Sequence, residues 1–200
     1  GRMRRAGKPS ELLELSSFLA LAALGCVLLY AIRVAVSGRI WYLYLVQNLG
    51  LAMVPYLIAA AASLLVERLG AGRRRSLALS ALAALWLLFY PNAPYIFTDF
   101  IHVIERTYLR ARPTEWLGLN ALLWYDLIMN AAFAFMGHFI GLVSMWLVHG
   151  TCARVWGRAR ARVLVLGAIL FSGFGIYLGR FSRLNSWDAL LDPRRVLAEV

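Results

Sequence analysis

Five long apolar runs limit what this chain can fold into. They cover roughly residues 15–36, 40–66, 77–90, 117–148 and 163–178. A helix needs about 20 apolar residues to cross the hydrocarbon core of a bilayer, which is about 30 Å thick. A helix also satisfies its own backbone hydrogen bonds in lipid, so these continuous runs predict spanning helices and not barrel strands. We therefore expect one all-α domain over residues 1–200, a polytopic helical membrane bundle with at least five transmembrane helices.

The basic residues lie between these runs, and their distribution predicts an orientation. More than half of the 21 Lys and Arg fall on one side of the predicted bundle, in three segments: Arg2, Arg4, Arg5 and Lys8; Arg68, Arg73, Arg74 and Arg75; and Arg154, Arg158, Arg160 and Arg162. Short loops rich in Lys and Arg stay on the cytoplasmic side of a membrane. We therefore expect an integral membrane protein with a cytoplasmic N-terminus and membrane lipids as partners. This topology also explains the net charge of +11 without a nucleic-acid partner.

The first polar string follows the third apolar run. Pro91 and Pro94 are three residues apart, and two prolines at that spacing interrupt a regular helix. The residues after them alternate between an apolar and a polar side, which predicts an amphipathic helix at the membrane interface over about 97–110. The polar side chains form either a helix stop with caps or part of a site. As candidates we take the ligand-binding residues Asn92 and Tyr95 and the catalytic residues Asp99 and His102.

The second polar string lies inside the fourth run and contains Tyr125, Asp126 and Asn130. A carboxylate in the outer part of a span must pair with a cation, take up a proton or contact water. Asp126 is therefore either half of a structural ion pair, most simply with Arg180 or Arg183, or a catalytic residue. Tyr125 beside it is a candidate ligand-binding residue.

The third polar string follows the fifth run. Arg180 and Arg183 are three residues apart, so one helix face can present both guanidinium groups to a carboxylate or a phosphate. The alternative is that both arginines extend from the span end to the interface. The ligand-binding candidates in this string are Arg180, Arg183, Asn185 and Asp188.

His138 lies in the middle of the fourth run, between Gly137 and Gly141. A histidine there either ligates haem or a chlorophyll-type pigment, or forms a hydrogen bond with a neighbouring helix. It is therefore a cofactor-binding candidate. Asp99, His102 and Asp126 lack a recognised metal-ligand spacing, and we expect no metal site.

Three strings in this sequence resemble a family of bacterial membrane proteins known as domain of unknown function 1361. They are FYPNAPYIFTDFIHV at 89–103, WYDLI at 124–128 and GIYLGRFSRLNSWDAL at 175–190. The resemblance covers roughly residues 20–195 and implies a small polytopic inner-membrane protein. It implies no catalytic residue, because the family has no established activity. Similar proteins continue into a further apolar span, and Asp192–Pro193 is typical of a helix start.

The predicted topology brings the three polar strings to one membrane face. We therefore expect a polar outer-face site that binds or processes an anionic or lipid-like ligand. The alternative is a non-catalytic accessory or structural subunit of a larger membrane complex, of the photosynthetic or respiratory type. In that case other membrane-protein subunits would be its partners, and His138 would be the residue to check for a pigment.

Overall fold

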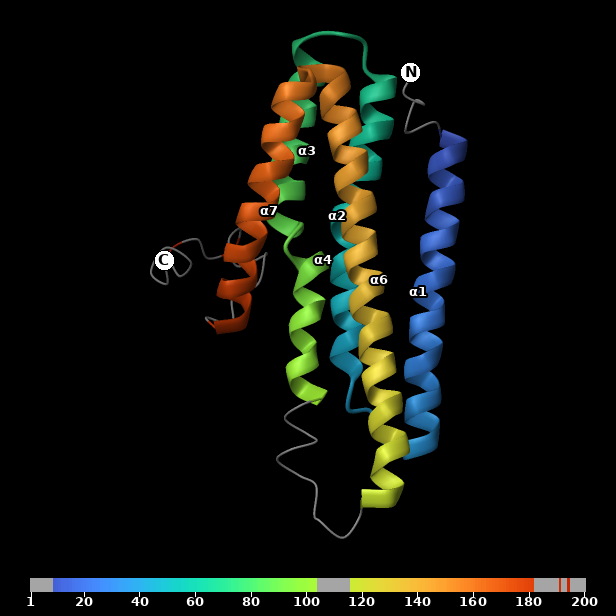
Figure 1. Cartoon of the computed structure of the whole chain (residues 1–200). Helices are drawn as coiled ribbons and strands as arrows, with labels where there is room; N and C mark the ends of the chain where they lie inside the picture. Colours follow the sequence, from blue (N-terminus) through green and yellow to red (C-terminus); the bar gives the residue numbers. More distant parts are fainter. Residues whose placement is uncertain (1–8, 104–115, 182–190, 192–193, 195–200) are drawn as a thin grey trace.

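The computed structural model of the chain describes residues 9–103 and 116–181, together with 191 and 194. Every regular element in this part of the chain is a helix (Figure 1). The elements are α1 (Pro9–Ser37), α2 (Leu43–Arg68), α3 (Arg73–Phe89), α4 (Asn92–Tyr95), the 3₁₀ helix η1 (Ile96–Asp99), α6 (Trp116–Trp156) and α7 (Arg158–Phe181).

Among the described residues, five stretches are long and apolar enough to cross a membrane, which confirms the predicted all-α bundle. They are Pro9–Ser37, Leu43–Arg68, Arg73–Val103, Ala121–Trp156 and Arg158–Arg180. In Figure 1 these helices run up and down beside one another, and successive spans point in opposite directions. The described connections between successive spans have one to five residues, and such short connections allow only antiparallel neighbours. At Gly157 (φ 91°) the chain adopts a conformation that suits glycine, and this allows the abrupt reversal between α6 and α7.

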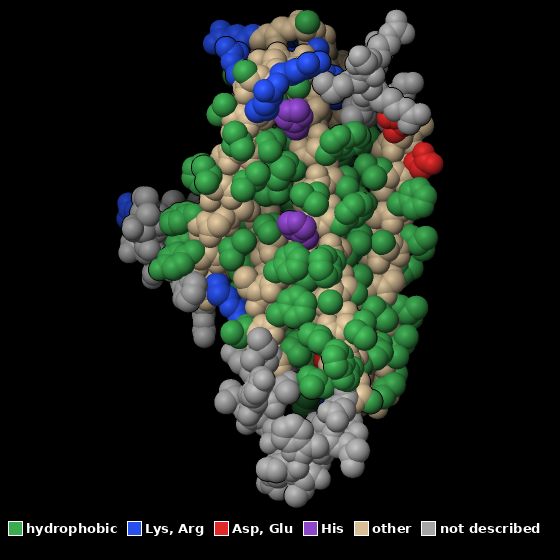
Figure 2. Space-filling view, viewed as in Figure 1, with side chains coloured by type: hydrophobic (Ala, Val, Ile, Leu, Met, Phe, Trp, Pro, Cys, Tyr) green, Lys and Arg blue, Asp and Glu red, His purple; other side chains and the backbone are tan. Residues whose placement is uncertain are grey.

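The centre of the bundle is formed by α2 and α6, and α1 and α7 lie on its two flanks (Figure 1). Half of the most apolar window of α6 is buried, whereas only 17% of the corresponding windows of α1 and α7 is buried. Trp86 is fully buried in the core, and its indole N–H donates to the hydroxyl of Ser144 at 2.6 Å. Large apolar side chains cover the outside, as expected for helices in contact with lipid (Figure 2).

One end of the bundle carries most of the described arginines, as the blue side chains at the top of Figure 2 show. We call it the basic end. It holds the α2–α3 and α6–α7 connections, with Arg68, Arg73, Arg74, Arg75, Arg154, Arg158, Arg160 and Arg162. The α1–α2 connection lies at the other end, which we call the opposite end. The sequence-based grouping of the second and third basic segments is therefore confirmed.

The third span is broken where the two prolines lie. α3 ends at Phe89, and the short helices α4 and η1 follow after a turn at residues 90 and 91. Three glycines on neighbouring helices make room for this broken segment. A Cβ added at Gly141 would lie 2.7 Å from the Cβ of Ala93, one at Gly137 would lie 2.9 Å from Ile96, and one at Gly175 would lie 2.8 Å from Pro91. These glycines pack within the bundle.

The segment after the break packs differently from the sequence-based expectation. Residues 97–103 continue the third span instead of forming a separate helix on the surface. Asp99 and Val103 are buried, and the ring of Phe97 packs edge-on against Phe135 on α6. The close approach at the glycines explains this, because it draws the whole segment against α2 and α6. Residues 104–110 of the expected interfacial helix lie outside the described residues.

Candidate functional site

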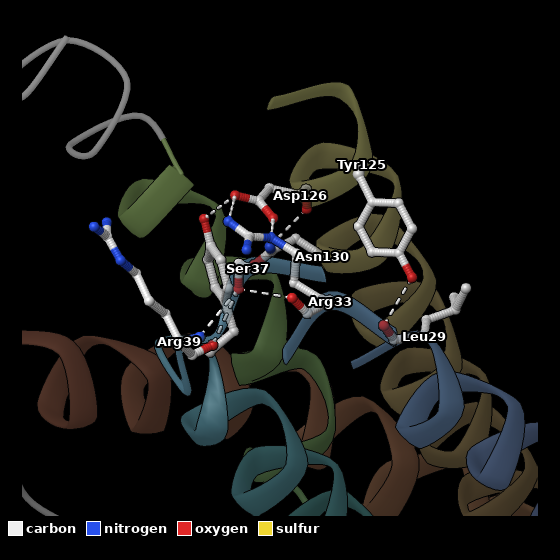
Figure 3. A network of polar contacts seen from close by, with 8 residues as sticks. Leu29, Arg33, Ser37, Arg39, Tyr125, Asp126 and Asn130 are labelled. Carbon is white, nitrogen blue, oxygen red and sulfur yellow. Dashed lines mark hydrogen bonds and ion pairs between the residues drawn. The ribbon is translucent and has the colours of Figure 1, made fainter. Parts of the chain in front are cut away.

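Asp126 forms a buried ion pair with Arg33 (Figure 3). The pair is bidentate: Arg33 Nε donates to Oδ1, and Nη2 donates to Oδ2 at 3.0 Å. The hydroxyl of Tyr42 also donates to Oδ2, at 2.7 Å. Asp126 is 7% exposed and Arg33 is 5% exposed, so both charges are withdrawn from solvent. A guanidinium fork matched to a carboxylate is the geometry that best compensates such burial.

The expectation that Arg180 or Arg183 would pair with Asp126 is therefore wrong. Both α6 and α7 extend away from the connection at Gly157, but α7 is the shorter helix. At 1.5 Å per residue, Arg180 ends about 12 Å short of the level of Asp126. α1 has the length to reach that level on the other flank of α6, and it supplies Arg33. Arg183 lies outside the described residues.

Tyr125, like Asp126 beside it, binds a residue of α1. Its hydroxyl donates to the backbone carbonyl of Leu29 on α1 at 2.8 Å (Figure 3). Asn130, one turn further along α6, is 1% exposed and donates to the carbonyl of Asp126 at 2.7 Å. The structure therefore places Tyr125 and Asp126 in the contact between α1 and α6, where they hold the two helices together.

Asp99 lies in η1, after the break in the third span, and its surroundings differ from those of Asp126. It is 3% exposed, and its Oδ2 accepts a hydrogen bond from Asn48 Nδ2 on α2 at 2.7 Å. His102 and Arg180 lie close enough to interact with it electrostatically. Among the described residues, no ion pair reaches this carboxylate. Asp99 is therefore a buried acid with a neutral amide as its direct partner and with Arg180 and His102 nearby.

The first turns of α2 connect the two aspartates. Tyr42 binds Asp126, and its ring lies 6.0 Å from the ring of Tyr44. Tyr44 in turn packs 4.8 Å from the ring of His102, and Asn48 binds Asp99. The structure thus brings Asp99, His102 and Asp126 to one region at the opposite end, around the start of α2. Arg180 joins this region from the last turn of α7.

Sequence reasoning missed four members of this cluster: Arg33, Tyr42, Tyr44 and Asn48. All four come from the first two apolar runs, residues 15–36 and 40–66, whereas the sequence analysis sought a site among the last three runs. Arg33 was detectable as the single charge in the run 15–36, where an isolated arginine requires a partner. The tyrosines carried no such signal, because aromatic residues at span ends are common anchors.

Asn92 and Tyr95 stabilise the break in the third span. Asn92 Nδ2 donates to the carbonyl of Phe89 at 3.0 Å, which caps the end of α3. The backbone N–H of Tyr95 donates to the carbonyl of Pro91, and the carbonyl of Tyr95 accepts a bond from the hydroxyl of Thr98. These contacts fit the alternative of a helix stop with caps. Asn185 and Asp188 lie outside the described residues.

His138 is half-buried on α6, and its ring meets the ring of Phe97 edge-on at 5.4 Å. Its role as a ligand to haem or pigment stays a prediction. In the described part of the chain, no three His, Cys, Asp or Glu side chains are grouped so that they could hold a metal ion.

The two aspartates therefore offer different chemistry. Asp126 accepts three hydrogen bonds, two of them from a cation, so it has little capacity for a further partner. Asp99 accepts one hydrogen bond, from the amide of Asn48, and keeps further acceptor positions. Of the two carboxylates, Asp99 therefore has the greater remaining capacity to accept a hydrogen bond.

Comparison with known proteins yields a family and no relative of known activity. No curated protein and no solved structure matches the chain. A family model described as "Protein of unknown function (DUF1361)" matches residues 47–200. The match contains Asn48, Asp99, Asp126 and Arg180, and it begins after α1, so Arg33 lies outside it. Because the match covers more than half of the sequence, the chain belongs to this family of proteins of unknown function.

Proposed function

We propose that this protein binds an anionic, hydroxyl-bearing head group, such as that of a lipid, at the polar cluster around Asp99. The observation that carries the proposal is the contrast between the two buried aspartates. Asp126 is neutralised by Arg33, whereas Asp99 lies near Arg180 and His102 without a described ion pair to either. A buried carboxylate left in this state at membrane depth is costly, and such residues mark functional sites by default.

The residues suggest distinct roles. Arg180 would hold the anionic group of the ligand, because guanidinium donors fit phosphate and carboxylate oxygens. Asp99 would accept a hydrogen bond from a hydroxyl of the same ligand, and Asn48 would keep the carboxylate in place. If the ligand is processed after binding, Asp99 and His102 are the groups positioned to move a proton.

Loss of the arginine should reduce anion binding strongly. A hydrogen bond to a charged group contributes about 1.5–3 kcal/mol. Arg180→Gln should therefore weaken the first bound phosphatidylglycerol by about tenfold or more, measured by native mass spectrometry of the detergent-solubilised protein. Arg162→Gln removes one charge at the basic end and is the matched control, with an expected change below about threefold. Equal effects of the two variants would contradict the proposal.

The carboxylate should select for the hydroxyl groups of the ligand. Asp99→Asn keeps the shape of the side chain but turns a charge-assisted hydrogen bond into a neutral one, which is roughly half as strong. We expect a weaker affinity for phosphatidylglycerol. For phosphatidylmethanol, which carries the same charge without the hydroxyls, we expect an unchanged or higher affinity, because the substitution also removes a carboxylate that repels the phosphate. An equal loss for both lipids would show that Asp99 acts only on the charge or the fold.

The second candidate function is an accessory subunit of a larger membrane complex, of the photosynthetic or respiratory type. The poor burial of α1 and α7 favours it, because both helices expose large apolar side chains along most of their length. Purification in mild detergent, followed by mass spectrometry of copurifying proteins and pigments, distinguishes the two functions. A stoichiometric partner subunit with no lipid preference at Asp99 would favour the accessory role.

The orientation and the membrane belong to the proposal as well. We place the protein in the bacterial inner membrane with its N-terminus in the cytoplasm, because the basic end would then face inward. In a Cys26→Ala/Cys152→Ala background, a membrane-impermeant maleimide added to intact cells should label Arg39→Cys in the α1–α2 connection. It should not label Gly70→Cys in the α2–α3 connection until the cells are opened. Labelling of residue 70 alone in intact cells would reverse the orientation.

A further inference from the structure

A groove of about 270 Å³ lies between α1 and α6 near the basic end. Leu12 and Leu147 are buried and form its floor, and Phe18 and Trp146 form exposed apolar walls. Glu11 and Glu14 also line it, and both are exposed in the first turns of α1. Its volume is slightly below the range of about 300–1,000 Å³ typical of ligand pockets, which is room for part of an elongated molecule.

The level of the groove in the bilayer follows from the charges of α1. Residues 15–32 contain no charged side chain and extend over about 27 Å, close to the hydrocarbon thickness of about 30 Å. Arg33 marks one boundary of this stretch and Glu14 marks the other. The two carboxylates therefore lie at head-group depth, and Phe18 lies one turn deeper, at the depth of the acyl chains.

The groove opens beside two negative charges, whereas the rest of the basic end is mostly positive. The basic end carries arginines on α2, α3, α6 and α7, and Glu67 there pairs with Arg154 at 3.8 Å. Glu11 and Glu14 form no ion pair with any residue that the structure describes. Figure 2 shows acidic side chains at one edge of the molecule, next to an apolar surface. Two adjacent carboxylates repel a purely anionic head group and favour one that brings a cation.

We propose that this groove binds one phospholipid whose head group carries a primary amine, of the phosphatidylethanolamine type. The ammonium group donates hydrogen bonds to Glu11 and Glu14, and the first part of one acyl chain lies on Leu12 and Leu147, between Phe18 and Trp146. A primary ammonium has three N–H donors, as in lysine, whereas a choline head group has the charge without a donor. The site is separate from the cluster at Asp99, which lies at the other end of the bundle.

Native mass spectrometry of the full chain tests the head-group preference. Phosphatidylethanolamine should occupy the first lipid site about tenfold more tightly than phosphatidylcholine with the same acyl chains. In the double variant Glu11→Gln/Glu14→Gln the ratio should fall to within about twofold of unity. Glu67→Gln, which removes a carboxylate from the same end but not from the groove, is the matched control and should keep the tenfold ratio. Equal binding of both lipids by the unmodified protein would overturn the proposal.

Quenching of Trp146 tests the location independently. Phosphatidylethanolamine with bromine atoms near the head-group end of its acyl chains should quench part of the tryptophan fluorescence. That part should be absent in Trp146→Phe, and it should shrink in the double glutamine variant. Quenching that is the same for ethanolamine and choline lipids, or the same in Trp146→Phe, would place the bound lipid elsewhere and overturn the proposal.

Discussion

Replacing Arg33 with alanine should lower the free energy of unfolding by about 3–5 kcal/mol, because it strands a buried carboxylate. Asp126 would keep Tyr42 as a hydrogen-bond donor but lose both bonds from the guanidinium group. It would then have to take up a proton or admit water between α1 and α6. Unfolding of the purified protein by denaturant in detergent, followed by circular dichroism, measures the loss.

Arg39→Ala is the matched control for this substitution. Arg39 follows α1 by two residues, and its guanidinium lies over the ring of Trp41, 4.4 Å from the centroid. A cation–π contact at such an exposed site contributes about 0.5–1 kcal/mol. The double variant Arg33→Met/Asp126→Leu, which removes both charges, should recover much of the stability lost in Arg33→Ala. If Arg33→Ala costs no more than Arg39→Ala, the ion pair does not stabilise the bundle.

Enlarging Gly141 should disrupt the docking of the broken segment. A Cβ at this position would lie 2.7 Å from the Cβ of Ala93, so α4 and α6 must move apart. Overpacking of this kind costs about 1–3 kcal/mol, and we expect Gly141→Ala to lower the free energy of unfolding by that amount and Gly141→Leu by more. Because η1 follows α4 directly, the same variants should weaken lipid binding at Asp99.

Gly50→Ala separates the packing effect from helix propensity. Gly50 is also inside a helix, but a Cβ added there meets no atom within 4 Å. Alanine is the better helix former by about 0.5–1 kcal/mol, so this variant should be as stable as the unmodified protein or more stable. A similar loss in Gly50→Ala and Gly141→Ala would mean that the contact with Ala93 does not decide stability.

The spans were predictable from the sequence because the bilayer imposes a simple rule on composition. An apolar run must be long enough to cross the hydrocarbon, and five runs were. The need of Asp126 for a partner was predictable for the same reason, since a carboxylate at that depth is costly. The prediction that Asp126 requires a partner is correct, although the partner is Arg33 and not Arg180 or Arg183.

The partner of Asp126 cannot be identified from the residues near it in the sequence, because it depends on how the helices pack. Arg33 and Asp126 are 93 residues apart, and which helix flanks α6 on that side is decided by packing of the whole bundle. The helix lengths argue against Arg180 as the partner, because α7 is too short to bring Arg180 to the level of Asp126. The position of residues 97–103 in the bundle was not predictable for a similar reason. Their amphipathic pattern fits a helix on a membrane surface. The segment packs inside the bundle because Gly137 and Gly141 on α6 leave room for the close approach of Ile96 and Ala93.

The separation of Arg33 and Asp126 along the chain has a consequence for biogenesis. α1 leaves the ribosome before α6, so Arg33 has no Asp126 to pair with until 93 further residues have been synthesised. At about 5–20 residues per second this interval is about 5–19 s. Arg33 lies only one turn before the end of α1, so its side chain can extend to the interface and stay hydrated during that time. The ion pair then forms as α6 enters the bilayer, which makes it a contact of late assembly that fixes the first helix to the bundle.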